Sequence, residues 1–298
     1  MQNILFRADS SSTIGTGHIM RDLILAKQYA DANIIFATQA LAGNINAKIE
    51  EDGYKIKTVR SNDLEELSSI IKNDNIDLII IDHYGIDATF ERRLKEKHPQ
   101  LHIMVLDDTY EQHFCDALLN HNVYADATRY KGLVPEYCEL KCGAAFTLLR
   151  DEFVQEKRQK KKHSNNVFLA MGGADHSNIN IEILKVLENF PDLHINVVTT
   201  TANQHITQLK NYATSRQNMT LHINTKHIAK LMHEADVAIV SPSVTLNEII
   251  FMETPFIAIK TAENQIEMYH YLVENSYPVL KKFDAQLLEK QVKGLLHD

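Results

Sequence analysis

The segment GTGHIMRD, which follows the first apolar run, carries residues well suited to chemistry. His18 falls at the expected start of a helix, where the positive end of the helix dipole disfavours imidazolium and favours the neutral base. A neutral imidazole can take a proton from water, an effect worth roughly 10²–10⁴ in rate. The alternative is that His18 caps the helix or contacts a phosphate. Arg21 and Asp22 follow on the same face of that helix.

Further acidic and aromatic residues follow other short apolar runs. Asp9 leaves the first run, and we expect its carboxylate to accept the second ring N–H of His18; a turn-forming role is the alternative. In IDHYG, Tyr84 is placed to donate a hydrogen bond to a substrate oxygen, or else to pack half-buried. Asp107 and Asp108 are adjacent, but no further ligand set accompanies them, so capping of turns or helices is favoured over a metal site.

Gly15 and Gly17 begin a glycine pattern that, if complete, would bind a dinucleotide. The pattern G-x-G-x-x-G needs a third glycine where this chain has Met20, whose side chain is too bulky for close helix–strand contact. We therefore expect no nicotinamide or flavin, and no other cofactor. Cys138 and Cys142 alone do not make a zinc site, so we expect no metal either.

In the second half of the chain, polar residues follow apolar runs in an order typical of a nucleotide diphosphate site. The pair Gly172–Gly173 is expected to expose backbone N–H groups above a helix N-terminus, which suits an anion. Ser243 lies near the expected start of a later helix, and Glu248 beyond it suits two adjacent ribose hydroxyls. The amide pair Asn264–Gln265 stands at the start of the next helix.

Short β-branched runs alternate with amphipathic stretches in both halves of the chain, which predicts two α/β units with parallel sheets covered on both faces. We expect Rossmann-type domains over 1–154 and 166–298, facing a cleft at the carboxyl ends of their strands. The basic segment 155–165 is expected to be a solvated linker, with an anion patch as the alternative. The pattern is less regular over 109–150. The last expected helix, 285–296, is a candidate for packing back on the first domain.

Composition excludes several broad classes of protein. The 298 residues are 44% hydrophobic and 23% charged, which is typical of a globular protein and not of a disordered or coiled-coil chain. The net charge of -8 offers no electrostatic reason to bind nucleic acid or an anionic membrane. We find no signal-peptide core and no run of about 20 apolar residues. With three cysteines, an odd number, a cytoplasmic location with reduced thiols is expected.

Six motifs occur in an order that resembles a known family: RADSSSTIGTGHIMRD, IIIDHYG, LDD, MGGAD, SPSVTLNE and ENQ. As far as Pro278, the chain is similar to the UDP-sugar hydrolases of pseudaminic acid biosynthesis, which have a GT-B-like fold. The resemblance implies hydrolysis of UDP-2,4-diacetamido-2,4,6-trideoxy-β-L-altropyranose at the anomeric carbon, with inversion and without a metal. The products would be UDP and the free sugar. It also implies a role in flagellin glycosylation.

The resemblance assigns roles to particular residues. It makes His18 the general base for water and places Tyr84 near the sugar or the attacking water, and Asp9 joins them as the third catalytic candidate. The expected substrate- and UDP-binding residues are Gly17, Arg21, Gly172, Gly173, Ser243, Glu248, Asn264 and Gln265. Pro242 departs from the small residue that is usual at its position, so we rank Ser243 below Glu248 as a ligand.

Two other functions stay open at this point. A UDP-sugar-dependent glycosyltransferase would share the architecture, but one that uses lipid-linked acceptors would usually show an exposed apolar or basic patch, and the first half has no long run of that kind. A non-catalytic module that binds nucleotide sugars would not need a base aimed at water. The release of UDP without an acceptor separates the three functions. The expected partner is the UDP-linked diacetamido sugar, with no nucleic acid and no membrane.

Overall fold

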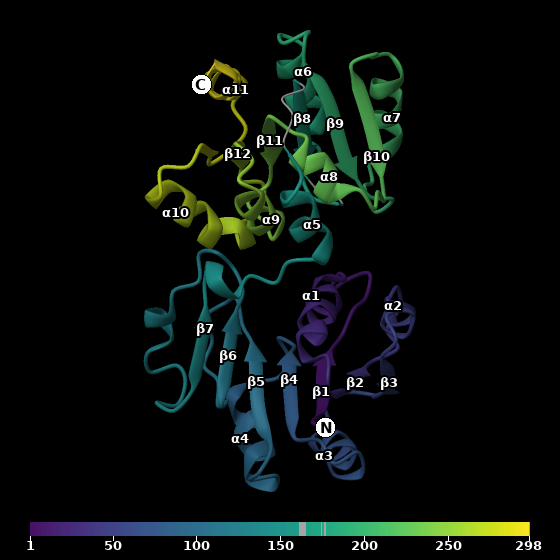
Figure 1. Cartoon of the computed structure of the whole chain (residues 1–298), viewed down its shortest axis with the longest axis vertical. Coiled ribbons are helices and arrows are strands. Elements are labelled where there is room, and N and C mark those ends of the chain that lie inside the picture. Colours follow the sequence, from purple (N-terminus) through teal and green to yellow (C-terminus); the bar gives the residue numbers. More distant parts are fainter. Residues whose placement is uncertain (161–164, 174, 176, 298) are drawn as a thin grey trace. The chain divides into compact units, whose positions relative to one another are not determined.

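The computed structural model describes residues 1–160, 165–173, 175 and 177–297. The chain forms two compact units, Met1–Leu148 and Leu149–Asp298, and each is built on its own parallel sheet (Figure 1). The expectation of two Rossmann-type α/β domains is therefore confirmed. The boundary falls between Leu148 and Leu149, whereas we expected it at residue 154. Part of the predicted basic linker, 161–164, lies outside the described residues.

The first unit contains a seven-stranded sheet in the order β3-β2-β1-β4-β5-β6-β7. The strands are β1 (Asn3–Ala8), β2 (Asn33–Thr38), β3 (Lys55–Thr58), β4 (Leu78–Asp82), β5 (His102–Leu106), β6 (Ala117–Asn120) and β7 (Glu139–Cys142). The helices are α1 (Gly17–Ala26), α2 (Asn46–Glu51), α3 (Leu64–Asn73) and α4 (Ala88–Lys97), with short 3₁₀ helices at Lys27–Tyr29, Ala127–Tyr130 and Ala144–Phe146. The order of strands reverses between β1 and β4, and ligands of open α/β sheets bind at such a point.

Each face of the first sheet has its own apolar core, because alternate residues of a strand point to opposite faces. Ile4 and Phe6 of β1 are buried in one core together with Ile19 of α1. Leu5, between them, is buried in the other core together with Leu67 of α3. We call these two sides the α1 face and the α3 face of the sheet.

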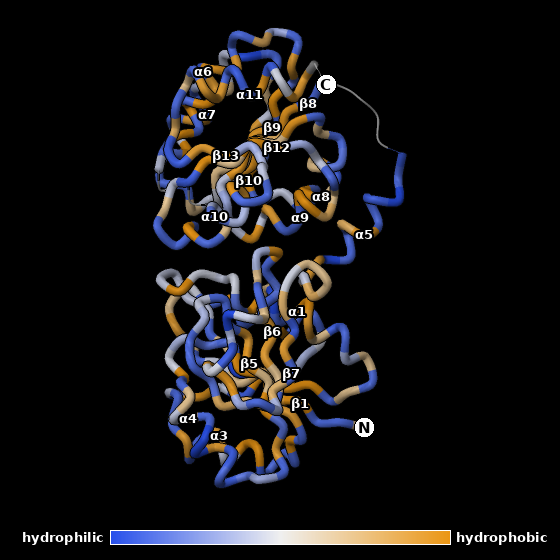
Figure 2. The backbone as a smooth tube through the Cα atoms, turned by 90° about the vertical axis from the view of Figure 1, so that its left-hand side faces the viewer, coloured by the Kyte–Doolittle hydropathy of each residue, from blue (hydrophilic) through white to orange (hydrophobic). Residues whose placement is uncertain are grey.

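The second unit contains a six-stranded sheet in the order β10-β9-β8-β11-β12-β13. The strands are β8 (Asn166–Ala170), β9 (His194–Thr199), β10 (Met219–Ile223), β11 (Val237–Val240), β12 (Phe256–Ile259) and β13 (Val279–Leu280). The helices are α5 (Asp151–Lys157), α6 (Asn180–Leu187), α7 (Ile206–Thr214), α8 (Ile228–His233), α9 (Thr245–Met252), α10 (Ile266–Glu274) and α11 (Ala285–His297), with a 3₁₀ helix at Glu263–Gln265. Figure 2 shows the hydrophobic residues gathered on the central strands of each unit.

Several elements differ from the expectations. Strand β7 closes the segment that we expected to be irregular, and α5 occupies the start of the expected linker. Helix α11 packs on α6, β11 and β12 of its own unit, with Leu288 and Val292 fully buried. The expected packing of the last helix on the first domain stays a prediction. No helix within the described residues has the length and apolar character needed to cross a bilayer.

Candidate active site

The carboxyl ends of β1, β4, β5 and β6 meet at one edge of the first sheet, and most of the predicted catalytic residues follow them. Gly17 opens α1, which rises from this edge, so His18 lies in the first turn of that helix as predicted. Asp82 is the last residue of β4, and Asp108 comes two residues after the end of β5. His18, Arg21, Asp82 and Asp108 contact one another, and we call these four residues the base cluster.

His18 is held by Asp82. Both side chains are largely buried, and His18 Nδ1 lies 2.7 Å from Asp82 Oδ1. Burial alone would raise the pKa of Asp82, but Arg21 and then His18 hold it well below its usual range, so the carboxyl is ionised. An ionised carboxylate only accepts hydrogen bonds. Nδ1 therefore carries the ring proton and Nε2 keeps its lone pair, which is the tautomer that a base acting through Nε2 needs.

Arg21 joins Asp82 to Asp108. Its Nε donates to Asp82 Oδ2 at 2.6 Å, its Nη2 donates to Asp82 Oδ1, and its Nη1 donates to Asp108 Oδ2 at 3.0 Å. Such paired contacts between a guanidinium and a carboxylate fix the plane of the carboxylate as well as its position. Arg21 thus orients the group that orients His18, and its predicted contact with substrate stays a prediction.

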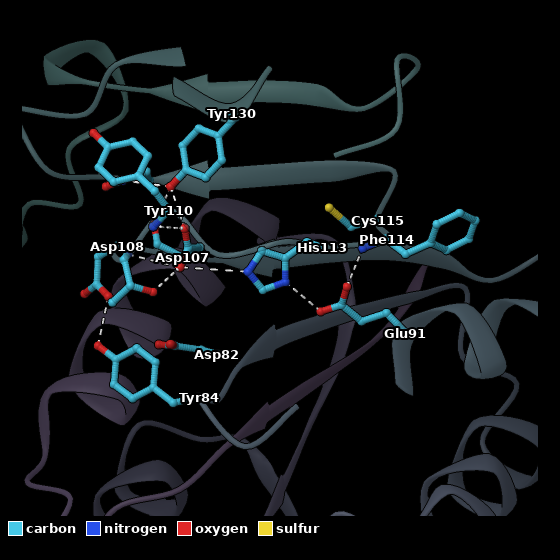
Figure 3. Close-up of polar contacts among 12 residues, drawn as sticks. Asp82, Tyr84, Glu91, Asp107, Asp108, Tyr110, His113, Phe114, Cys115 and Tyr130 are labelled. Carbon is cyan, nitrogen blue, oxygen red and sulfur yellow. Dashed lines mark hydrogen bonds and ion pairs between the residues drawn. The ribbon is translucent and has the colours of Figure 1, made fainter. Parts of the chain in front are cut away.

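Tyr84 lies on the open side of the base cluster and is 66% exposed. Its hydroxyl donates to Asp108 Oδ1 at 2.8 Å, and its ring meets the His18 ring edge-on with the centroids 4.9 Å apart (Figure 3 shows the contact with Asp108). Partial burial of the hydroxyl and the charge of Asp108 raise its pKa, so the oxygen keeps its proton. The single hydroxyl proton is donated to Asp108, so Tyr84 would have to exchange this partner to donate to a ligand. Its expected role as a donor to substrate stays a prediction.

Asp9 does not orient His18. Its carboxylate accepts two hydrogen bonds from Arg7, at 2.7 and 2.8 Å, and two from the backbone and side chain of Gln39, both at 2.7 Å. The reason is the two-residue period of a strand, since Asp9 shares the α3 face with Arg7 while His18 lies on the α1 face. The expected contact is wrong, and Asp82 holds the ring instead. Asp82 could have been identified from its position in the motif IIIDHYG, where it alternates with buried residues of the α1 face.

Asp107 belongs to a second polar network, on the α3 face. It accepts a hydrogen bond from the backbone N–H of Tyr110 at 2.8 Å, so the predicted turn-capping role is confirmed for Asp107. Tyr130 donates to the same carboxylate at 2.7 Å, and His113 Nε2 lies 3.8 Å from it (Figure 3). Asp108 differs from its neighbour, because it serves the base cluster and not a turn.

His113 lies between two carboxylates. Its Nδ1 is 2.8 Å from Oε1 of Glu91, a residue that is fully buried, and Asp107 lies on the other side of the ring. Burial alone would lower the pKa of His113, but Asp107 and Glu91 raise it to about 9. The imidazole is therefore charged near neutral pH and bridges the two carboxylates.

This bridge predicts a pH-dependent stability. Because the pKa of His113 rises from 6.5 to about 9 on folding, its contribution is complete below about pH 6.5 and is lost as pH rises through 9. The shift is about 2.5 pKa units, and at about 1.4 kcal/mol per unit the contribution is about 3.5 kcal/mol. Urea denaturation of wild type and H113Q should show a difference in the free energy of unfolding that shrinks over this range. H102Q, which replaces an exposed histidine, is the control. If the difference in the free energy of unfolding between wild type and H113Q stays constant with pH, the prediction is contradicted.

A cavity of about 430 Å³ lies between the loops that follow β4 and β5. His83 and Tyr84 line it from the first loop, and Asp107, Thr109 and His113 line it from the second. Tyr84 therefore contacts both the base cluster and this cavity, which has room for a polar substituent of a ligand.

In the second unit, the pair Gly172–Gly173 follows β8. Gly172 has a φ of +86°, a conformation that favours glycine. A Cβ atom on Gly173 would lie 2.9 Å from Cγ2 of Thr200, so the loops after β8 and β9 approach each other closely here. Gly173 is exposed, as expected, and the expected helix follows as α6, which begins at Asn180. Residues 174 and 176 lie outside the described residues.

The start of α6 is occupied by Asp175. This carboxyl is buried, and it accepts from Asn180 Nδ2 at 2.5 Å and from Ser177 Oγ at 3.1 Å. The backbone of the glycine pair itself is the part of this edge that suits an anion.

Glu248 lies in the first turn of α9 and is paired with Arg150. Arg150 Nη2 donates to Glu248 Oε1 at 3.0 Å, and Nε lies 3.3 Å from the same oxygen. Burial raises the pKa of Glu248, and Arg150 opposes this rise. The sequence analysis missed Arg150 because it lies 98 residues from its partner, so no local pattern connects the two. Ser243 stands just before α9 and is partly exposed, as expected.

The predicted amide pair forms the 3₁₀ helix Glu263–Gln265 that leads into α10. Asn264 is exposed and can meet a ligand. Gln265 uses its amide oxygen locally, where it accepts from the backbone N–H groups of Thr261 at 2.8 Å and Ala262 at 3.2 Å. Gln265 therefore holds the loop after β12, and Asn264 is the better candidate for binding. Across the described residues, no three His, Cys, Asp or Glu side chains are grouped so that they could hold a metal ion.

Comparison with known proteins gives a consistent result. The chain is 38% identical over 280 residues to the UDP-2,4-diacetamido-2,4,6-trideoxy-β-L-altropyranose hydrolase of Campylobacter jejuni. The aligned region covers 94% of this chain and 99% of that protein. No model of a protein family matches the chain.

Solved structures show the same fold at low sequence identity. MurG of Acinetobacter baumannii has a TM-score of 0.66 at 12% identity, covering 99% of this chain and 91% of that one. The spinosyn rhamnosyltransferase SpnG complexed with thymidine diphosphate has a TM-score of 0.67 at 11% identity, covering 100% and 92%. These similarities confirm the GT-B fold.

Proposed function

Because this chain belongs to the family of UDP-2,4-diacetamido-2,4,6-trideoxy-β-L-altropyranose hydrolases, we propose that it cleaves this UDP-sugar at the anomeric carbon with inversion. The products are UDP and the free sugar, which serves pseudaminic acid synthesis in the cytoplasm. The observation that carries the proposal is the His18–Asp82 contact of 2.7 Å, which leaves Nε2 of the ring with its lone pair. A nucleotide-binding module alone would not require this arrangement.

In the proposed reaction, His18 Nε2 takes a proton from water as the water oxygen bonds to the anomeric carbon. The bond between that carbon and the UDP oxygen breaks, and its electron pair leaves with UDP. Asp82 stabilises the imidazolium that forms, a role like that of the acid in other histidine–carboxylate pairs. Tyr84 keeps its proton and exchanges its bond to Asp108 for one to an oxygen of the sugar or to the attacking water. The imidazolium then returns its proton to solvent.

The second unit is proposed to bind UDP. The exposed backbone at Gly172–Gly173 suits the diphosphate, Glu248 suits the ribose hydroxyls, and Ser243 and Asn264 lie at neighbouring loops. Backbone N–H groups that neutralise the leaving group would take the place of a metal. Activity that survives exhaustive chelation would support this part of the proposal.

Replacing Glu248 with alanine is expected to weaken UDP binding by roughly 10- to 100-fold, because hydrogen bonds to charged groups contribute about 1.5–3 kcal/mol. The rate of bound substrate should change little, since Glu248 touches no reacting atom in the proposal. Calorimetric titration with UDP and steady-state kinetics measure the two effects. E253A is the matched control, because Glu253 at the other end of α9 is exposed and pairs with Lys157. An unchanged UDP affinity in E248A would dismiss the ribose assignment.

The proposal is tested by hydrolysis in ¹⁸O-water. Attack at carbon places the label on the sugar, whereas label in UDP would mean attack at phosphorus and would remove His18 from its proposed role. A panel of UDP-sugars, scored for UDP release without an acceptor, separates hydrolysis from the alternative of glycosyl transfer. UDP that appears only when an acceptor is present would favour the transferase.

A further inference from the structure

Asp22 is a charged residue of α1 that the base cluster leaves unexplained. It directly follows Arg21 and lies one helical turn after His18. Its side chain is fully buried, and no hydrogen-bond donor among the described residues reaches either of its carboxyl oxygens. A buried carboxylate with no donor is strongly unfavourable, and such a group takes up a proton instead.

The neighbouring charges leave Asp22 without a counter-ion. Arg21 is the adjacent cation, but its Nε and Nη2 donate to Asp82 and its Nη1 donates to Asp108. His121 follows β6 on the same face, and burial together with the charge of Arg21 lowers its pKa to about 4, so it is neutral near pH 7. One guanidinium therefore already faces two carboxylates before Asp22 is counted.

The charge of Asp82 acts on Asp22, and two carboxyl groups can share a hydrogen bond only when one of them holds a proton. Burial and then the charge of Asp82 raise the pKa of Asp22 well above its usual range, although Arg21 opposes them. An ionised carboxylate can accept about four hydrogen bonds. His18 Nδ1 and the Nε and Nη2 of Arg21 fill three of these positions on Asp82.

We propose that Asp22 is a neutral carboxylic acid that donates the fourth hydrogen bond to Asp82 and thereby acts as a positioning residue for His18. If Asp22 were ionised, three carboxylates would face one guanidinium beside the ring and would favour imidazolium, which cannot accept a proton from water. The proton on Asp22 keeps the ring available as a base. The protonation stands on the buried geometry alone, whereas the role in catalysis rests on the proposed function.

The test compares D22N with D22L. Asparagine has the shape of the protonated acid and can donate to Asp82 without ionising, so the acidic limb of the pH profile of kcat/KM should stay where it is in wild type. Leucine is of similar size but donates nothing. Without its fourth donor, Asp82 stabilises the imidazolium more strongly, so in D22L the acidic limb should move to higher pH by about half a unit to one unit. Turnover should fall by about tenfold as Asp82 loses its fixed position.

Two kinetic results would overturn the proposal. A limb that moves to lower pH in D22N means that the substitution removed a negative charge, so Asp22 is ionised in wild type. Equal losses of turnover in both variants, with the limb unmoved, mean that Asp22 only fills space.

Infrared difference spectra of the protein without substrate provide a readout that needs no turnover. At neutral pH, wild type should show the carbonyl band of a protonated carboxyl group, and D22N and D22L should both lack it. If wild type lacks this band, Asp22 is not protonated, and this conclusion does not depend on the activity of the enzyme. If D22L does not fold, the comparison of wild type with D22N is sufficient. A band present in a protein that hydrolyses no UDP-sugar would sustain the protonation and reject only the proposed function.

Discussion

Replacing His18 with asparagine is expected to lower kcat by roughly 10²–10⁴, because the variant has no group that can take a proton from water. The amide nitrogen of asparagine can still donate to Asp82, which lies 2.7 Å from Nδ1 of the native ring. The surroundings of the base should therefore persist while the base itself is lost. Turnover of the UDP-sugar under saturating conditions measures this effect.

The affinity for UDP identifies the role that is lost. If His18 acts as a base, H18N and H18A should bind UDP about as well as wild type does, because the proposal assigns UDP to the second unit. A variant that turns over normally but binds UDP weakly would show that His18 contacts a phosphate, the alternative that its place at the start of α1 leaves open.

Replacing Asp82 with asparagine is expected to lower kcat by roughly 10³–10⁴, as happens when the acid of a histidine–carboxylate pair is replaced in other hydrolases. The amide group can donate to Nδ1 of His18, which would move the ring proton to Nε2 and leave the lone pair facing away from water. Arg21 would also lose its ionic partner. Breaking a buried ion pair in this way typically costs about 3–5 kcal/mol of stability.

D108N is the matched control for this prediction. Asp108 also accepts from Arg21, at 3.0 Å, but it makes no contact with Nδ1 of His18. We expect a loss of about tenfold, through Arg21 and Tyr84, with the ring proton still on Nδ1. Nitrogen chemical shifts of His18 report the tautomer in both variants. An Nδ1–H tautomer that persists in D82N would contradict the assigned role of Asp82.

The alternation of apolar and amphipathic stretches was sufficient to predict two parallel α/β units and the place of His18 in the first turn of α1. These features depend on neighbours in the chain, since helix and strand periods and glycine turns are visible over a few residues. The motif IIIDHYG likewise located Tyr84 at a strand end beside the base. Short or late elements such as β7 and β13 carry too few apolar residues to stand out.

The catalytic partners depended on which face of the sheet each residue occupies. Asp9 follows β1 and Asp82 ends β4 at the same edge, and the sequence analysis assigned the contact with His18 to Asp9. The structure separates them, since Asp82 meets His18 on the α1 face and Asp9 meets Arg7 on the α3 face. Asp107 and Asp108, adjacent in the chain, are divided in the same way. A strand turns successive side chains to opposite sides, so closeness in sequence does not mean a shared site.

Residue types and local spacing thus sufficed to predict the fold class, the candidate base and the glycine loop after β8. The partners of those residues became visible only once distant segments were packed together. Arg150 pairs with Glu248, and Arg21 bridges Asp82 and Asp108. Two of these contacts join residues 61 and 98 positions apart, and they form because packed helices and strands bring those side chains together. Charge, protonation and tautomer depend on such neighbours, and so does the chemistry of this site.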